Sequence, residues 1–306
     1  MAGRKREMEL SERLLMSALL VERGSVAADV GCDHGFTSIW LVQRGICPRV
    51  LAMDVNPGPL ERAGEHIREA GLSAYIETRL SDGLSAMKCP DGKPEADTLL
   101  MAGIGGRLAC RIMKDAQDKL RRMRAVIVQP QSELFCVRRT LAELRYRITA
   151  ENMVKEGGKF YTAIRAENAA FSGKNGFGEK EAFPADQPEA GMIPPVPADQ
   201  PEAGMIPPVP DGLRLSEKDW ESAGEQYGFC LLLKKHPVLR EYLEDVLRRN
   251  RTAREALLEG TGRKAGECPP EEAGVLERSR ARLAGLEAEA ALAGTLAAWL
   301  KEREDG

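Results

Sequence analysis

The first half of the chain alternates short apolar runs with segments of helical periodicity, and this alternation constrains the fold more than any other feature. The apolar runs lie at residues 26–30, 50–55, 75–80, 96–102 and 125–128. Strands that are separated by helices need crossover connections, which predicts a parallel sheet. Two later runs, 147–154 and 160–166, are separated only by residues 155–159, so they predict an antiparallel hairpin at the sheet edge. A helix is predicted before the first strand, at 10–22.

The second half of the chain changes in composition. From 168 to 211 it is rich in Gly, Pro, Ala and acids, and it holds two tandem copies of PADQPEAGMIPPV, starting at Pro184 and Pro197. Such a segment predicts a disordered or loosely polyproline linker; a peptide-binding role for its IPPVP motif is the alternative. Beyond it, the apolar run 229–233 is predicted to extend the sheet edge. Heptad-spaced apolar residues then predict two helices that form an antiparallel hairpin of coiled-coil type.

These patterns predict three segments. Residues 1–167 form an α/β domain, 168–212 form the linker, and 213–306 contain the sheet-edge segment and the helical hairpin. Residues 1–167 carry 26 Lys+Arg against 22 Asp+Glu and the remainder carries 18 against 25, so the first domain is mildly basic and is compatible with a polyanionic partner.

Composition also predicts what the protein lacks. No apolar run approaches the ~20 residues that cross a bilayer, and the basic N-terminus leads into an amphipathic segment. The seven cysteines form no CxxC pair and the chain has only three histidines, so no zinc framework is predicted. We expect a cytoplasmic protein, monomeric, without a metal or a membrane segment.

The sequence VAADVGCDHGFTSIWL at 26–41 reads as a strand, a glycine turn and a helix. At such a turn the backbone of Gly31 can approach a ligand, beside the N–H groups of a helix N-terminus. A dinucleotide fingerprint needs GxGxxG, but this turn carries Asp33 where a pyrophosphate would approach, which disfavours an NAD-dependent dehydrogenase. S-adenosylmethionine instead brings an ammonium and a sulfonium, which suit Asp29 and Asp33. The alternative for the turn alone is a simple strand-to-helix connection.

Acidic residues also follow the next two strands. Asp54, 23 residues after Gly31, can accept both ribose hydroxyls of a nucleoside, and Asp82-Gly83 can meet an adenine ring. A ligand that lies across the carboxyl ends of a parallel sheet would meet all three turns. The predicted cofactor-binding residues are Asp29, Gly31, Asp33, His34, Gly35, Asp54, Asp82, Gly83 and Gly103.

The fourth and fifth strands end in MAGIGG at 101–106 and VQPQ at 128–131. Three glycines leave room for a flat base, and the amide of Gln131 offers a donor and an acceptor to a base edge. A loop glutamine that faces water is the alternative.

Taken together, these motifs resemble those of a known family, the bacterial tRNA adenine-N1 methyltransferases called TrmK, which act on adenine 22 of tRNA. The resemblance rests on LSERL at residue 10, ADVGCDHG at 28, DGL at 82, MAGIGG at 101, VQPQ at 128 and GGKFY at 157. It covers 10–167 in order and the two-helix tail in outline. It implies a Rossmann-like class I methyltransferase domain, a helical coiled-coil domain, and binding of S-adenosylmethionine and tRNA. The chain departs from the family in Gln131, where members have Asn, in Asp54, commonly Glu, and in the repeated linker.

Adenine N1 carries a neutral lone pair, so it can attack the sulfonium methyl directly, and the enzyme's main task is positioning. We hypothesise that Asp33 or the backbone of 103–106 orients the base, and that Gln131 and Tyr161 define its pocket, with Tyr161 or Phe36 as an aromatic wall. The predicted catalytic residues are Asp33, Gly105, Gln131 and Tyr161.

Basic clusters in both halves are candidate phosphate contacts, although each alone could be a solvated face. The clusters are Lys119, Arg121, Arg122 and Arg124, then Arg138 and Arg139, then Arg248, Arg249, Arg251 and Arg254. The predicted substrate-binding residues are Arg107, Arg121, Arg122, Arg138, Arg139, Arg248, Arg249 and Arg251. The alternatives are a methyltransferase for another RNA or a small substrate, and a noncatalytic RNA-binding protein.

Overall fold

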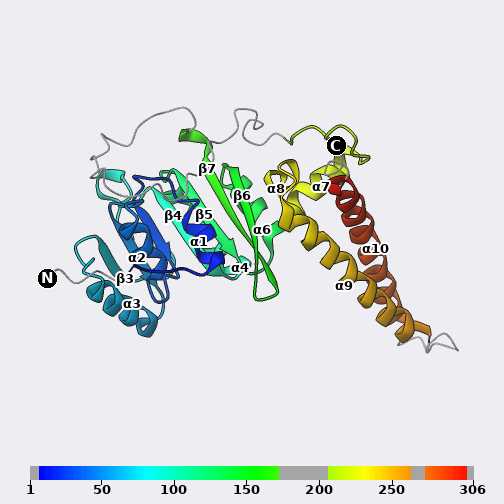
Figure 1. Ribbon diagram of the computed structural model, residues 1–306, viewed down its shortest axis with the longest axis horizontal. Helices are drawn as coiled ribbons and strands as arrows, with labels where there is room; N and C mark the ends of the chain where they lie inside the picture. Colours follow the sequence, from blue (N-terminus) through cyan, green and yellow to red (C-terminus); the bar gives the residue numbers. More distant parts are fainter. Residues whose placement is uncertain (1–6, 172–205, 263–272, 302–306) are drawn as a thin grey trace. The chain divides into compact units, whose positions relative to one another are not determined.

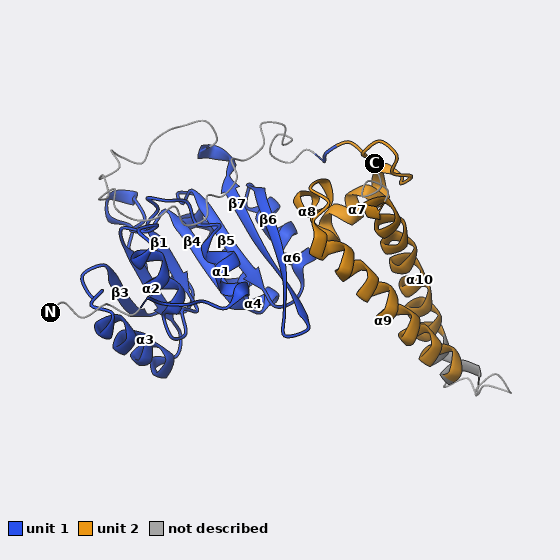
Figure 2. Ribbon diagram, viewed as in Figure 1, with its two compact units in different colours: residues 1–207 blue, residues 208–306 orange. Residues whose placement is uncertain are grey.

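The computed structural model describes residues 7–171, 206–262 and 273–301 (Figure 1). The chain divides into two compact units, residues 1–207 and 208–306 (Figure 2).

Unit 1 is built on a seven-stranded sheet with the order β3-β2-β1-β4-β5-β7-β6. The strands are β1 Ala27–Val30, β2 Val50–Asp54, β3 Ile76–Leu80, β4 Thr98–Ile104, β5 Ala125–Pro130, β6 Tyr146–Glu156 and β7 Lys159–Asn168. The first five are mutually parallel, and β7 pairs antiparallel with both β5 and β6. The predicted mostly parallel sheet with an antiparallel edge is therefore confirmed.

Helices cover both faces of this sheet. They are α1 Glu12–Ala18, α2 Phe36–Gln43, α3 Pro57–Glu69, α4 Gly106–Asp115, α5 Gln117–Leu120 and α6 Leu134–Glu143. Short 3-10 helices lie at Pro90–Gly92 and Ala169–Phe171. One buried cluster joins the sheet to α1, α2 and α3, and a second joins it to α4, α5 and α6. Strands β1, β2 and β5 are buried along their whole length, as expected for parallel strands covered on both faces.

The predicted first helix is longer than the observed one. Residues 10–22 have helical spacing, but α1 runs only from Glu12 to Ala18, and Leu19 caps its C-terminus. The chain then turns toward β1 through Gly24, whose φ is +88°. The last strand ends at Asn168, one residue beyond the predicted domain boundary of 167.

The prediction for the run 229–233 is wrong. These residues form α8 Phe229–Leu233, a helix in unit 2 that follows α7 Glu217–Tyr227. The ring of Phe229 packs against α7: it lies 5.2 Å from the ring of Trp220, and a Cβ on Gly224 would come within 2.1 Å of it. A short apolar run has no periodicity that separates a strand from a buried helix, so tertiary packing decides between them.

Unit 2 also holds two long helices, α9 Pro237–Gly262 and α10 Ala273–Lys301. Asn250 and Arg254 of α9 contact Glu289 and Glu287 of α10, while Lys235, before α9, donates to the Trp299 carbonyl. Residue numbers rise along α9 where they fall along α10, so the two helices run antiparallel. The coiled-coil character of the pair stays a prediction.

Two further predictions concern these segments. The linker at 168–212 falls mostly outside the described residues, including nearly all of its tandem repeat, so it stays a prediction. Among the described helices one, over Glu277–Lys301, is long and apolar enough to cross a membrane by length and composition alone. The same helix packs along α9.

Candidate active site

The loop after β1 has the backbone conformation that its glycines predict. Gly31, Asp33 and Gly35 all have left-handed φ angles, of +76°, +48° and +72°. The N–H groups of Gly31 and Cys32 donate to the carbonyl of Met53 on β2, at 2.9 and 3.1 Å. A Cβ on Gly31 would meet no atom within 4 Å, so the backbone here opens onto free space where a ligand can approach.

Gly35 serves another purpose. It is the N-cap of α2, and a Cβ there would lie 3.2 Å from the Cβ of Ala63 on α3. Its missing side chain therefore lets α2 and α3 pack closely. The prediction that Gly35 binds cofactor has no support from this geometry beyond its place in the loop.

Asp54, the last residue of β2, ties three loops together. Its two carboxylate oxygens accept the N–H groups of Asn56, at 2.8 Å, and of Asp33, at 3.3 Å. Its carbonyl accepts the N–H of Ser81, the residue after β3, at 2.8 Å. Each carboxylate oxygen can accept more than one hydrogen bond, so Asp54 keeps capacity for two ligand hydroxyls while it fixes the loops around them.

Asp29 lies deeper than its predicted role requires. Its side chain is 2% exposed and accepts the Ser38 hydroxyl of α2 at 2.6 Å. Burial raises the pKa of this carboxyl to about 6; the nearby Asp54 adds to the rise and the Ser38 bond opposes it. Asp29 therefore links β1 to α2. Because its side chain is buried, it can act on a ligand through its charge but not by direct contact.

Asp33 and His34 form the exposed rim of the same loop. The Asp33 carboxylate lies 3.6 Å from His34 Nε2, and the two side chains are 67% and 36% exposed. The His34 ring stacks on Phe36 with centroids 5.3 Å apart, and Phe36 stacks in turn on His66 of α3 at 5.0 Å. The centroids of His34 and His66 also lie 5.8 Å apart, so the predicted aromatic wall at Phe36 belongs to a compact cluster of three rings.

The loop after β3 carries Asp82 and Gly83. Asp82 is exposed and pairs with Arg111 of α4 at 3.2 Å. Gly83 has a φ of +55°, and a Cβ there would lie 2.9 Å from Ile112. A pocket opens beside this loop, lined by residues 82–85 and by α4 and α5.

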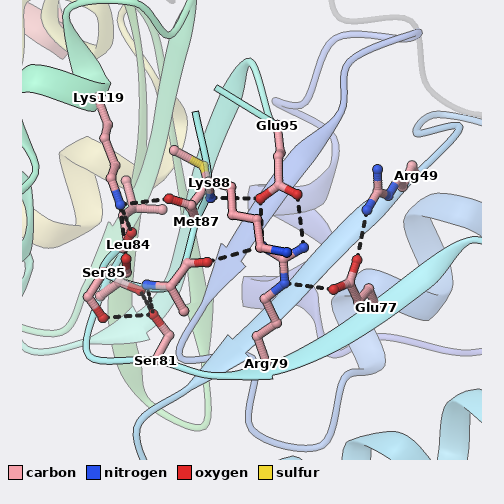
Figure 3. A network of polar contacts seen from close by, with 12 residues as sticks. Arg49, Glu77, Arg79, Ser81, Leu84, Ser85, Met87, Lys88, Glu95 and Lys119 are labelled. Carbon is pink, nitrogen blue, oxygen red and sulfur yellow. Dashed lines mark hydrogen bonds and ion pairs between the residues drawn. The ribbon is translucent and has the colours of Figure 1, made fainter. Parts of the chain in front are cut away.

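Two cations hold this loop in place (Figure 3). Lys119 of α5 donates to three of its carbonyls, those of Leu84, Ser85 and Met87, at 2.5, 3.1 and 2.7 Å. Arg79 of β3 donates to the Ala86 carbonyl at 3.1 Å.

Arg79 is itself fixed by carboxylates. It pairs with Glu95 through both of its terminal nitrogens, at 2.6 and 3.0 Å, and with Glu77 at 2.7 Å. The Arg79 guanidinium lowers the pKa of Glu95 to about 2 and also lowers that of Glu77. Arg79 and Lys119 therefore anchor the loop that presents Asp82, through hydrogen bonds to its backbone carbonyls.

The end of β4 is open. A Cβ on Gly105 would meet nothing within 4 Å, whereas one on Gly106 would lie 2.1 Å from the Ser132 carbonyl oxygen. Gly103 has a φ of +80°, and a Cβ there would lie 3.8 Å from Nε2 of Gln131. The Gln131 N–H donates to the carbonyl of Ile104 at 2.8 Å, which keeps the ends of β4 and β5 together.

Arg13 lies beside predicted site residues, although the sequence did not mark it as a candidate. Its Nη1 would lie 3.1 Å from a Cβ on Gly103, and its guanidinium carbon lies 5.8 Å from the centroid of the Tyr161 ring. Arg13 thus lies between Gly103, a predicted cofactor-binding residue, and Tyr161, a predicted catalytic residue. The only signal in the sequence is the LSERL motif, which contains Arg13 but gives no sign of its partners.

Several predicted phosphate contacts have partners inside the protein. Arg138 is 5% exposed and pairs with the buried Glu151 at 2.8 Å, so the prediction that it contacts substrate is wrong: α6 turns it toward the sheet. Lys119 is occupied by the three carbonyls described above, and Arg124 pairs with Glu22 at 2.6 Å.

The other predicted phosphate contacts lie on the surface. Arg107, Arg121, Arg122, Arg139, Arg248, Arg249 and Arg251 are all exposed. Arg107, at the start of α4 beside Gly105, is 88% exposed in its side chain although it pairs with Glu133. Arg248 and Arg249 share Asp245. Within the described ranges no group of three or more His, Cys, Asp or Glu could hold a metal ion.

The arrangement suits a nucleoside that carries positive charge. The turns after β1, β2 and β3 lie at the same edge of neighbouring strands, and they present Gly31, Asp54 and Asp82. The glycine-lined end of β4 lies next to β1. A long ligand across the first three turns would therefore bring its reactive end to the open floor at 103–106.

The chain is similar in sequence to known methyltransferases. The family described as "Methyltransferase domain" matches residues 10–164. The chain is 33% identical over 171 residues to the tRNA (adenine(22)-N(1))-methyltransferase of Bacillus subtilis, an alignment that covers 55% of this chain and 70% of the relative. It is 25% identical over 153 residues to a putative tRNA methyltransferase of Mycoplasma pneumoniae, over 50% of this chain and 68% of that one.

Solved structures share the fold across both units. The B. subtilis M1A22 tRNA methyltransferase TrmK has a TM-score of 0.67 at 23% identity, and the match covers 95% of this chain and all of that one. A putative tRNA (m1A22) methyltransferase from Streptococcus pneumoniae, in complex with S-adenosyl-L-methionine, has a TM-score of 0.60 at 24% identity, over 92% of this chain and all of that one. A protein of the NADB-Rossmann superfamily from Streptococcus agalactiae has a TM-score of 0.67 at 23% identity, over 96% and 100%.

Proposed function

The chain belongs to the family of tRNA (adenine(22)-N(1))-methyltransferases, and on that premise we propose that it transfers the methyl group of S-adenosylmethionine to N1 of adenine 22 in tRNA. The observation that carries this proposal is the set of three joined turns at the ends of β1, β2 and β3. They give a nucleoside ligand an open backbone at Gly31 and a carboxylate at Asp54, beside the floor at 103–106.

The residues present fit S-adenosylmethionine. Asp54 has capacity for the two ribose hydroxyls, and the exposed Asp82 can accept the adenine amino group. Asp29 and Asp33 add negative charge near the turn, which favours a ligand with an ammonium and a sulfonium. When bound, the cofactor supplies an electrophilic methyl group; the residues of the chain hold it and orient the acceptor.

The target base needs positioning more than activation. Because adenine N1 has a free lone pair, no residue has to remove a proton before methyl transfer, and correct alignment provides most of the rate increase. The open backbone at Gly105 admits a flat ring, and the Gln131 amide can bond its edge. Asp33, on the neighbouring loop, faces the same edge of the sheet. These roles are part of the proposal.

The phosphate backbone of tRNA would contact exposed arginines. Those on unit 1 are Arg107, Arg121, Arg122 and Arg139, and those on unit 2 are Arg248, Arg249 and Arg251. Exposed cations with a carboxylate partner can exchange it for phosphate at little cost, because surface ion pairs contribute only ~0–1 kcal/mol. We further propose that the protein acts as a monomer in the cytoplasm, where its substrate is found.

The test uses the full chain, labelled S-adenosylmethionine and unmodified tRNA transcripts, with methylated nucleosides mapped by mass spectrometry. We expect N1-methyladenosine at position 22, and none when that adenine is replaced by guanine. Asp54→Asn should abolish cofactor binding, whereas the matched carboxylate-to-amide change at the exposed Glu65 of α3 should have no effect. Cofactor binding without methylated tRNA would point to another substrate, and no cofactor binding would refute the proposal.

A further inference from the structure

We infer that Arg13 binds a phosphate group that adjoins the target nucleotide and so places the base over the floor at 103–106. This inference rests on the proposed function. It concerns a side chain on α1, the helix that packs on β4 to β7, and this side chain lies beside Gly103.

The position of Arg13 is set by a missing side chain. A Cβ on Gly103 would lie 3.1 Å from Nη1, so the guanidinium occupies space that any other residue at 103 would fill. Its other side faces the Tyr161 ring of β7, with the guanidinium carbon 5.8 Å from the ring centroid. A cation held over an aromatic face is stabilised there and loses side-chain freedom before any ligand arrives.

The helix that carries Arg13 is fixed at both ends. At its start, the Glu156 carboxylate at the end of β6 accepts the Arg13 N–H at 3.1 Å and lies 3.5 Å from Nε. Beyond its end, Arg165 of β7 donates to the Leu20 carbonyl at 2.8 Å and pairs with Glu22 at 3.0 Å. Helix α1 therefore lies firmly across β4, β5, β7 and β6 (Figure 1).

One edge of the guanidinium remains open. Glu156 takes the Nε side, and in the described part of the chain neither Nη1 nor Nη2 of Arg13 donates a hydrogen bond to a protein acceptor. The side chain is 28% exposed, so part of it is accessible to a ligand. Their parallel N–H bonds match two oxygens of one phosphate.

The chemistry of the reaction favours phosphate over the base itself as the ligand. Methyl transfer moves the positive charge of the sulfonium onto the adenine ring, and a guanidinium bonded to that ring would oppose it. A phosphate of the same nucleotide presents a negative charge a few ångströms from the base. Binding it fixes the nucleotide without touching the ring.

The test compares Arg13→Met and Arg13→Lys with the wild-type enzyme on two RNAs. One is an unmodified tRNA, and the other carries uncharged methylphosphonate linkages on both sides of the target adenosine. The matched control is Arg44→Met, because Arg44 also pairs with a carboxylate, that of Glu7 at 3.4 Å, and lies 5.9 Å from an aromatic centroid, that of Trp40. Arg44 is at the C-terminus of α2, away from the turns.

On unmodified tRNA we expect Arg13→Met to lower kcat/KM roughly 10- to 100-fold, as for loss of a charge-assisted bond. Arg13→Lys should lower kcat/KM less, and Arg44→Met should leave kcat/KM unchanged. On the methylphosphonate RNA the wild-type enzyme should fall to the level of Arg13→Met, so the difference between them should vanish. The Kd for S-adenosylmethionine, which also reports folding, should be unchanged.

Three results would overturn the inference: an unchanged kcat/KM in Arg13→Met, an equal fold loss on both RNAs, or a weaker S-adenosylmethionine Kd with an unchanged KM for tRNA. The last would assign the open edge to the carboxylate of the cofactor. If Arg13→Met does not fold, the wild-type enzyme alone tests the inference. An equal kcat/KM on the unmodified and the methylphosphonate RNA would then refute it. Failure of the proposed function is distinct, because the wild-type enzyme would then methylate neither RNA.

Discussion

Replacing Lys119 by Met should loosen the loop that presents Asp82 to the cofactor. The Lys119 ammonium donates to the carbonyls of Leu84, Ser85 and Met87, and methionine keeps the apolar stem but removes all three bonds (Figure 3). Hydrogen bonds that involve a charged group contribute about 1.5–3 kcal/mol each when buried. The released carbonyls lie near the surface and regain water, so we expect a total loss of about 2–3 kcal/mol. For a domain of this size that corresponds to a Tm decrease of roughly 4–12 °C.

The assay has two readouts, Tm from thermal unfolding and the S-adenosylmethionine Kd from calorimetry. The Kd should weaken roughly 5-fold, since a looser loop must be ordered on binding at about 1 kcal/mol. Lys114→Met is the matched control, because Lys114 of α4 makes only an exposed pair with Glu143 at 3.0 Å, worth about 0–1 kcal/mol. Equal Tm values and equal cofactor affinities for the two variants would show that the three carbonyl bonds do not hold the loop.

Three other changes test separate parts of the structure. The pKa of Asp29 is about 6 in the folded protein against ~3.9 in the unfolded chain, so the folded state binds a proton more tightly and stability falls as pH rises from about 4 to 6. Asp29→Asn should flatten this decline and add up to ~3 kcal/mol to the free energy of unfolding at pH 8. A decline of the same size in urea unfolding of the variant would contradict this. Gly103→Ala, at a φ of +80°, should displace the Arg13 guanidinium and lower kcat/KM for tRNA, and a kcat/KM equal to that of the wild-type enzyme would contradict this. Arg138→Met should leave buried Glu151 unpaired and cost about 3–5 kcal/mol of stability, while tRNA affinity of the folded variant stays the same; a weaker tRNA Kd would restore Arg138 as a phosphate contact.

The sequence alone predicted the sheet and the edge at which the candidate site lies. Apolar runs of strand length separated by helical segments specify a parallel sheet, and the short connection around Gly157 specifies the hairpin, because periodicity and loop length are local properties. The positions of Gly31, Asp54 and Asp82 after three successive strands followed from the same pattern. Parallel strands bring such positions to one edge whatever else the chain does.

Only the tertiary structure decided which cations are available and which are occupied. Arg13 and Glu156 are 143 residues apart, and no local pattern pairs them. Lys119 and Arg138 read as surface cations, yet one holds a loop and the other is buried, because the partner of a charged side chain depends on how distant elements pack. The same reason explains the run 229–233. It forms a helix and not a strand because the Phe229 ring packs on Gly224, which has no side chain.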